Sequence, residues 1–305
     1  MNRAQFALDL KRIVDAEVQK SLEAWDSLLG PVAKKISIDQ AYYILENRVG
    51  MGLLYEMDEG GRFSQDNFDL GYNKTFHMKK YGLAAQITEE LIEDNKSPFD
   101  FAVEIGKSFK KAERETDNIM IASLLNNAID TGAANLGLDG KPLLSTTHDP
   151  DYVSQSNRLA VDADFSESTL ESLRHLANSI TDKRGLKGRV RLDTLVMHPD
   201  NIEEVHRVLG GDMRPGTADN DPNANRLEGD IKTRIFSPYL TDTDATYILT
   251  NKNKDDQGLV YVERRPLRVR MKEDEFTESF HWMASKRARA LFGAWDCIVG
   301  TVGAA

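Results

Sequence analysis

The chain has 305 residues, enough for one large domain or two, and its 40% hydrophobic and 29% charged residues are typical of a globular protein. Its 39 lysines and arginines against 49 aspartates and glutamates give a formal net charge of −10, which argues against tight, general binding to nucleic-acid phosphates. No apolar run approaches the length that spans a bilayer, and charges at Asp9, Lys11 and Arg12 predict that no signal peptide is present. The single cysteine, Cys297, excludes a disulfide framework and lies among apolar residues, which predicts a buried, unreactive thiol in a cytosolic protein.

The N-terminal region, residues 3–29, is expected to form a helix that stops at Gly30-Pro31. Its apolar stripe is narrow and its opposite face is charged, so it suits an arm laid across a neighbouring molecule at least as well as a core helix. The apolar stripe of this helix consists of Val14, Val18, Leu22, Trp25 and Leu29.

Residues 31–47 are mixed and predict no single element.

Residues 49–93 change to short β-like runs that contain glycines. An outgoing strand over 50–55 and a return strand over 79–88 flank a polar excursion, in which residues 59–62 predict a turn. The excursion has too few large apolar residues to form a core of its own. We therefore expect an extended hairpin that rests on another subunit.

Residues 97–130 predict one long helix, with Ser97 as the N-cap, Pro98 at the first helical position and Thr131-Gly132 at the end. At 1.5 Å per residue it would be about 50 Å long. Its apolar stripe is expected to lie on a sheet, and its charged middle, Lys110 to Asp117, to face solvent or a neighbouring subunit. The stripe consists of Phe101, Ile105, Phe109, Ala112, Ile119 and Ser123.

An α/β section follows a loop over residues 136–151. It contains a helix over 166–182 capped by Ser166, a short buried strand over 193–197 and a helix that runs to Leu209. A polar loop over 210–230 is long enough to predict a functional or mobile segment.

The last fifty residues alternate apolar and polar side chains in two runs, which predicts a long antiparallel hairpin with its turn at Asp274-Glu275. We expect this hairpin to pack under the long helix. Basic residues gather in both runs, and we interpret them as one solvated sheet face, with a local phosphate or partner contact as the alternative. They are Arg264, Arg265, Arg268, Arg270, Lys272, Lys286, Arg287 and Arg289.

No constellation for catalysis, cofactor binding or metal binding is found, so we predict no enzyme activity, no cofactor and no metal site. The six histidines lack metal-ligand spacing and are interpreted as surface residues or as support for neighbouring groups. Residues 219–230 place oxygen ligands as a calcium loop does, but Ala224 replaces the required glycine and Asp230 the bidentate glutamate, so calcium binding is not expected. The histidines are His77, His148, His175, His198, His206 and His281.

Taken in order, these elements resemble the major capsid protein of tailed bacteriophages. Residues 81–90, YGLAAQITEE, are similar to the strand that returns from that family's extended loop (the E-loop). Residues 136–148, LGLDGKPLLSTTH, are similar to a stretch of many head proteins that reads Gly-x-Asp-Gly-x-x-Leu-x-Ser-x-x-His-Pro. Further similar segments follow in the family's order. Two departures, a residue inserted between His148 and Pro150 and Thr246 in place of a tryptophan, concern local packing alone. The further segments are 182–185, 195–199, 240–245 and 287–303.

The resemblance implies an α+β capsid fold, in which a P-domain is braced by a long spine helix and an antiparallel sheet, with an A-domain, an E-loop and an N-terminal arm. The implied divisions are the arm at 1–47, the E-loop with its basal strands at 48–93, the spine helix at 94–135, the A-domain at 136–257 and the C-terminal hairpin at 258–305. The helix at 166–182 would lie near the junction of the A-domain with the P-domain.

The implied function is self-assembly, as hexamers and pentamers, into an icosahedral shell around packaged double-stranded DNA. The implied partners are a separate scaffolding protein, a portal and, in some heads, a cement protein, with DNA as non-specific content and no membrane. A separate scaffold is expected because the fold starts within the first fifty residues. The location is the virion, and the host cytoplasm during assembly.

Two alternatives stay open. The same fold could form an encapsulin-like compartment around a cargo enzyme, and the genes beside this one would discriminate. A soluble enzyme using carboxylates such as Asp219 and Asp221 belongs to another class, although no residue spacing supports it.

Overall fold

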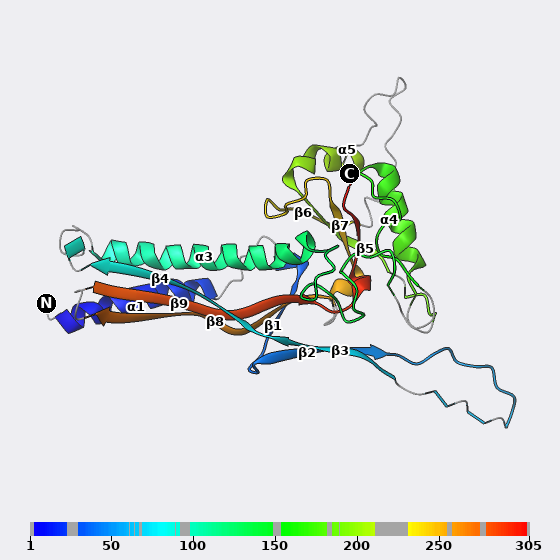
Figure 1. The fold of residues 1–305 in the computed structure, drawn as a ribbon, viewed down its shortest axis with the longest axis horizontal. Coiled ribbons are helices and arrows are strands. Elements are labelled where there is room, and N and C mark those ends of the chain that lie inside the picture. The colour runs from blue at the N-terminus through cyan, green and yellow to red at the C-terminus, as the bar shows by residue number, and fades with distance from the viewer. Residues whose placement is uncertain are drawn as a thin grey trace, which may run out of the picture.

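The computed structural model describes most of the chain, and Figure 1 shows an elongated molecule with a long sheet-and-helix body, a second α/β unit and a projecting ribbon. Among the described residues, no helix is long and apolar enough to cross a membrane. The described residues are 3–22, 30–60, 62–63, 65–66, 69–88, 90–91, 98–148, 154–181, 185–188, 190–210, 231–254, 258–274 and 279–303.

The body is built on a sheet whose described strands run in the order β1-β8-β9-β4. The predicted C-terminal hairpin is confirmed as the antiparallel pair β8 and β9, and the return strand β4 lies antiparallel beside β9. β1 adds in parallel to the start of β8, a pairing that the sequence did not indicate. The bounds are β1 Lys34–Ser37, β4 Lys79–Thr88, β8 Leu259–Asp274 and β9 Ser279–Phe292.

Two helices, α1 (Arg3–Leu22) and α3 (Pro98–Asn126), cover one face of this sheet (Figure 1). Val14 and Val18 of the expected arm stripe are buried with Trp282 of β9, so α1 packs within its own chain. The other end of the stripe, Trp25 and Leu29, lies outside the described residues, as does the cap Ser97.

The long helix is confirmed in place, although α3 has 29 described residues and thus a length of about 43 Å. Its expected stripe is wrong at Ile119, which is 57% exposed. The reason is that the two halves of α3 face different cores. Phe109 in the first half packs on the β8–β9 hairpin, whereas Ile121 and Leu125 in the second half lie in a cluster shared with the second sheet.

The projecting ribbon is an antiparallel pair of β2 (Tyr42–Val49) and β3 (Asp69–His77), with a register irregularity between Glu46 and Arg48. The outgoing strand is therefore earlier than predicted. Residues 50–60, all of which the structure describes, contain a turn at Glu59 and Gly60 but no strand.

The second unit contains a sheet with the described strand order β10-β7-β5-β6. Ser166 caps α4 as predicted, its hydroxyl accepting the Thr169 N–H, but the helix ends at Ser179 because Ile180 is extended. The predicted buried strand and the helix to Leu209 are present as β5 and α5, whereas the loop over 211–230 lies outside the described residues. The bounds are α4 Glu167–Ser179, β5 Leu192–Met197, α5 Ile202–Leu209, β6 Thr233–Phe236, β7 Thr246–Thr250 and β10 Ile298–Thr301.

Candidate assembly surfaces and the contacts that position them

The ribbon extends away from the body (Figure 1), and it exposes large apolar side chains. Leu54 is fully exposed and Phe63 is 87% exposed, and Leu53 and Tyr55 are each 72% exposed. A two-stranded ribbon with such a surface is marginal in water on its own, because nothing in it buries these groups. The ribbon is therefore a surface that another molecule can cover. Other exposed apolar residues along it are Tyr42, Ile44, Met51, Met57 and Tyr72.

The root of the ribbon, in contrast, is anchored to the body. Leu45 of β2 and Phe76 of β3 are buried against the outer side of β8, in a cluster with Val260 and Val262. Arg289 donates from Nη1 to the His77 carbonyl at 3.1 Å, and its guanidinium lies 5.2 Å from the Phe76 ring centre. The body thus fixes where the ribbon leaves, while the tip is unsupported.

A second contact joins Lys74 of β3 to the loop that follows α3. The Lys74 ammonium donates to the Leu136 carbonyl at 2.9 Å. Partial burial lowers the pKa of Lys74, and the positive charge of Arg289 lowers it further. This hydrogen bond connects the root of the ribbon to the loop that follows α3.

A buried charge cluster fastens α3 to the sheet. Lys286 of β9 donates to Glu113 at 2.7 Å and to Asp117 at 2.9 Å, and its ammonium lies 3.2 Å from Glu263 of β8. Tyr261 of β8 donates its hydroxyl proton to the second oxygen of Asp117 at 2.7 Å. Lys286 and Asp117 are only 4% and 2% exposed, so these bonds form in a region from which water is excluded.

This cluster corrects two predictions. The middle of α3 does not face outward throughout, because Glu113 and Asp117, four residues apart, point together at the sheet. Lys286 is not on the solvated face, since the strand alternation places it with buried Ala284 and Ala288. That alternation was the signal in the sequence that could have located it.

The charges in the cluster stabilise one another. Burial lowers the pKa of Lys286, but the carboxylates of Asp117 and Glu113 outweigh that effect and leave the pKa raised. Burial and the adjacent Asp117 raise the pKa of the Tyr261 phenol. The lysine is therefore held as a cation and the phenol as a neutral donor, which defines the position of the helix along the sheet.

The loop after α3 reaches the second unit through a buried histidine. His148 has no exposed surface, so of the two expected roles for the histidines it has that of supporting neighbouring groups. Its Nδ1 lies 2.6 Å from Asp139, its Nε2 lies 3.0 Å from Asn157, and its ring stacks on Trp295 with 4.6 Å between centres. The sequence motif that contains Asp139 and His148 is thus a packing motif.

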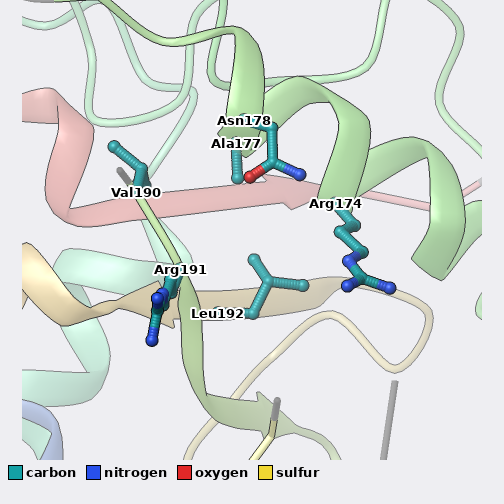
Figure 2. Close-up of a pocket in the computed structure, with 6 residues that line it drawn as sticks. All are labelled: Arg174, Ala177, Asn178, Val190, Arg191 and Leu192. Atoms are coloured by element: carbon teal, nitrogen blue, oxygen red, sulfur yellow. The ribbon is translucent and has the colours of Figure 1, made fainter. Parts of the chain in front are cut away.

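A cavity of about 360 Å³ lies where the end of α4 meets the start of β5. Figure 2 shows Arg174 and Arg191 on either side of Leu192. None of the described lining residues is a carboxylate, a histidine or a hydroxyl nucleophile, so these walls supply no acid–base pair. The lining residues are Arg174, Ala177, Asn178, Val190, Arg191 and Leu192.

The remaining candidates for chemistry are placed as follows. Among the described residues, no group of three His, Cys, Asp or Glu side chains could hold a metal ion. Cys297 is buried as predicted, and burial raises the pKa of its thiol. His198 caps a short 3-10 helix by accepting the Asp200 N–H, and His206 is exposed on α5. Asp219 and Asp221 lie outside the described residues.

Comparison with known proteins gives two positive findings. Residues 72–299 match a family model described as phage capsid protein. Solved structures with the same fold cover nearly the whole chain, and they confirm the predicted α+β capsid architecture. No curated protein matches the chain in sequence.

Three of these structures illustrate the likeness. The capsid of a native GTA particle is 13% identical, with a TM-score of 0.57, and covers 91% of this chain and 90% of its own. The solved structure of Microbacterium phage Oxtober96 contains a chain that is 9% identical to this one, with a TM-score of 0.54, and the match covers 91% of each chain. A virus-like particle from Pyrococcus furiosus is 11% identical, with a TM-score of 0.53, and covers 96% and 97%. At such identities the likeness shows the fold.

Proposed function

Because the chain belongs to the phage capsid protein family, we propose that it is the major subunit of a phage head, assembling into the icosahedral shell that encloses packaged double-stranded DNA. The observation that carries the proposal is the ribbon between β2 and β3. Its root is packed into the body, yet its tip presents Leu53, Leu54, Tyr55 and Phe63 to solvent. Such a surface is typical of a subunit that gains a partner on assembly.

The partner in this proposal is another copy of the chain, in hexamers and pentamers. An extended ribbon can bury its apolar side chains only against a molecule that lies beside the body it comes from. The anchored root supports this geometry, because Arg289 holds the direction in which the ribbon leaves, through a hydrogen bond to the His77 carbonyl and a cation–π contact with Phe76. Every subunit would therefore offer its tip to a neighbour at the same angle.

The division of the chain follows the same proposal. We assign residues 1–41 to the arm, 42–93 to the E-loop with its basal strands, 94–135 to the spine, 136–257 to the A-domain and 258–305 to the returning hairpin. We propose 42 as the start of the E-loop, in place of the expected 48, and the support for this is that β2 begins at Tyr42 and pairs with β3.

The other partners belong to the proposal too. They are a separate scaffolding protein, a portal and a cement protein. The location is the virion, preceded by the host cytoplasm during assembly. The packaged DNA is non-specific content, in keeping with the net charge of −10, and the subunit catalyses no reaction.

Electron microscopy of the purified full chain, alone and with its scaffold, tests the proposal. Shells, tubes or capsomers are the expected products. Replacing residues 52–66 with a short Gly-Ser linker keeps the end pair Val49 and Asp69 and should leave a folded subunit that forms no shells. A wild-type chain that stays monomeric under all conditions would contradict the proposal, and a linker variant that still forms shells would contradict the role of the tip.

The contents of native particles discriminate the compartment alternative. Packaged double-stranded DNA is expected for a phage head, whereas a protein cargo in a DNA-free shell would favour an encapsulin-like compartment. The enzyme alternative depends on Asp219 and Asp221, and membership of the capsid protein family gives it no support.

A further inference from the structure

The body sheet has an open edge along the far half of β8. β1 pairs with β8 only at Val260–Glu263, and among the described residues no other strand lies on that side of β8. Backbone N–H and C=O groups on such an edge can pair with an extended segment of another molecule. We call residues 267–272 of β8, all of which the structure describes, the open edge.

The two faces of the open edge differ in character. Leu267, Val269 and Met271 point towards the helices and pack in the cluster that contains Trp282. The residues between them are cations whose side chains are exposed on the other face, because side chains alternate along a strand. These cations are Arg268, Arg270 and Lys272.

A groove with an apolar wall runs beside the open edge. Its volume is about 520 Å³, and it lies where α1 meets β8. Side chains from both elements form it, so an extended segment lying along the edge would find apolar surface next to exposed cations. The lining residues are Lys11, Asp15, Val18, Leu267, Arg268, Val269, Arg270 and Met271.

The cationic face continues across the neighbouring strands. Arg265 of β8, Arg287 of β9 and Lys80 of β4 lie directly opposite one another, an arrangement in which like charges repel. The Nε atoms of Arg265 and Arg287 are buried and have no hydrogen-bond partner in the described part of the chain. None of these three cations, nor any on the open edge, forms an ion pair with a described carboxylate. The face therefore attracts negative charge from another molecule.

The tip of the ribbon has the complementary pattern. Residues 53–58, LLYEMD, form no strand, and all six side chains are exposed. Within the described residues, neither Glu56 nor Asp58 has an ion pair. If this segment were a strand, alternation would place Leu53, Tyr55 and Met57 on one face and both carboxylates on the other.

We propose that residues 53–58 of one copy add as a strand to the open edge of β8 in a second copy. Tyr55 and Met57 would then lie on the side of the groove, and Glu56 and Asp58 beside the cations. The two carboxylates are two residues apart, as are Arg268 and Arg270, so each pair spans about 6.8 Å along its strand. The inference rests on the proposed function, in which the tip contacts another copy, and it names the surface that receives the tip.

The arrangement of the chain explains why the partner is a second copy. Figure 1 shows the ribbon tip and the far end of the β8–β9 hairpin at opposite ends of the molecule, so the tip cannot lie on its own edge. Each copy has one such tip and one such edge. The contact is therefore head-to-tail and can repeat around a ring.

The charges also determine which strands the edge accepts. Cations on an open edge prevent uncontrolled pairing, because two β8 edges brought together repel each other. An acidic strand is attracted to the same edge. The cations of the open edge thus reject other copies of β8 and favour the ribbon tip.

Charge reversal in the full chain tests the contact, with shell yield followed by light scattering and microscopy. Glu56→Lys with Asp58→Lys should lower the yield by about tenfold or more, and so should Arg268→Glu with Arg270→Glu, because each variant brings like charges together. Combining all four substitutions restores opposite charges and should recover shells. Glu171→Lys with Glu203→Lys, at exposed positions of α4 and α5, changes the net charge as the first variant does and should keep the wild-type yield.

The outcomes separate this inference from the proposed function. If the wild type forms shells but the four-substitution variant does not, the contact is refuted. Loss of shells from the β8 variant alone would also refute it, because the edge would then receive a different acidic molecule. A wild type that forms no shells contradicts the proposed function itself.

Cysteine crosslinking tests the strand and the direction in which its side chains point. The native Cys297 is buried and does not interfere. Glu56→Cys, combined in turn with Arg268→Cys, Arg270→Cys or Lys272→Cys, should give covalent oligomers on mild oxidation in at least one combination, because side chains on the same face of adjacent strands are within disulfide reach. Met57→Cys in the same combinations points to the other face and should give none.

This second test decides even if the charge-reversed β8 variant does not fold. Equal crosslinking from Glu56→Cys and Met57→Cys would refute the addition of a strand. So would the absence of crosslinks from Glu56→Cys in all three combinations while shells still form.

Discussion

The ribbon and the body differ in where their large apolar side chains lie. In the body, apolar side chains meet between layers, and even the charges of Lys286 and Asp117 are buried and paired. In the ribbon, Leu54 is fully exposed and Phe63 is 87% exposed. The body is therefore stable through contacts within the chain, while the ribbon tip has apolar surface left over for contacts between chains. Changes in the two regions should affect different measurements.

The largest loss of folding stability is expected from Lys286→Met. The substitution leaves the carboxylates of Glu113, Asp117 and Glu263 buried without their shared counterion. Removing one partner of such a group costs about 3–5 kcal/mol in the free energy of unfolding. Urea unfolding of the subunit measures it, with the exposed Lys80→Met on β4 as the matched control. Equal effects of the two substitutions would show that the cluster does not fasten the helix.

Leu10→Ala tests whether α1 belongs to its own body. Leu10 is 2% exposed and packs in the same cluster as Trp282 of β9. Creating a cavity there should lower the free energy of unfolding by about 2–5 kcal/mol in the isolated subunit. The control Ile119→Ala, at an exposed position on α3, should change it by less than about 0.5 kcal/mol. A silent Leu10→Ala would mean that the arm packs on a neighbour instead.

Ser166→Ala should have an intermediate effect, because it removes the side-chain acceptor for the Thr169 N–H at the start of α4. Loss of an N-cap costs about 1 kcal/mol. Thermal or urea unfolding can resolve this difference. Ser172→Ala, an exposed serine within the same helix, keeps the cap and should be nearly neutral.

The smallest effect on folding, with the largest effect on assembly, is expected from replacing Leu53, Leu54 and Tyr55 together with serine. These side chains contact little in their own chain, so the free energy of unfolding should stay within about 0.5 kcal/mol of the wild type. Shell formation, followed by light scattering and microscopy, should fail. Normal shells from this variant, or a large loss of stability, would remove the contrast between ribbon and body.

The sequence predicted the elements whose signals are local. Strand alternation located β8 and β9, periodicity with a proline at the first turn located α3, and Ser166 located the start of α4. It missed β1, which has four residues and pairs with a strand more than two hundred residues away. It also missed β2, because Ile44 and Leu45 put apolar side chains on both faces and hide the alternation.

The contacts that position the assembly surface were harder to predict for the same reason. The strand alternation could have placed Lys286 on the buried face, but nothing local identifies its partner Glu113, which is 173 residues away. His148 is close to Asp139 in sequence, but its burial depends on Trp295 near the other end of the chain. Pairing of charges across such distances leaves no periodic pattern, so only the folded chain reveals it.

The register irregularity between Glu46 and Arg48 affects the direction in which the ribbon points. A bulge bends its strand and increases the local twist, and everything beyond it moves as the end of a lever. Ten extended residues past the bulge span at most about 35 Å, so a change of about 10° there displaces the tip by about 6 Å. A single insertion or deletion at this point would redirect the tip while leaving Leu53, Leu54 and Tyr55 unchanged. The direction of the tip is thus set close to the root of the ribbon, at the register shift between Glu46 and Arg48.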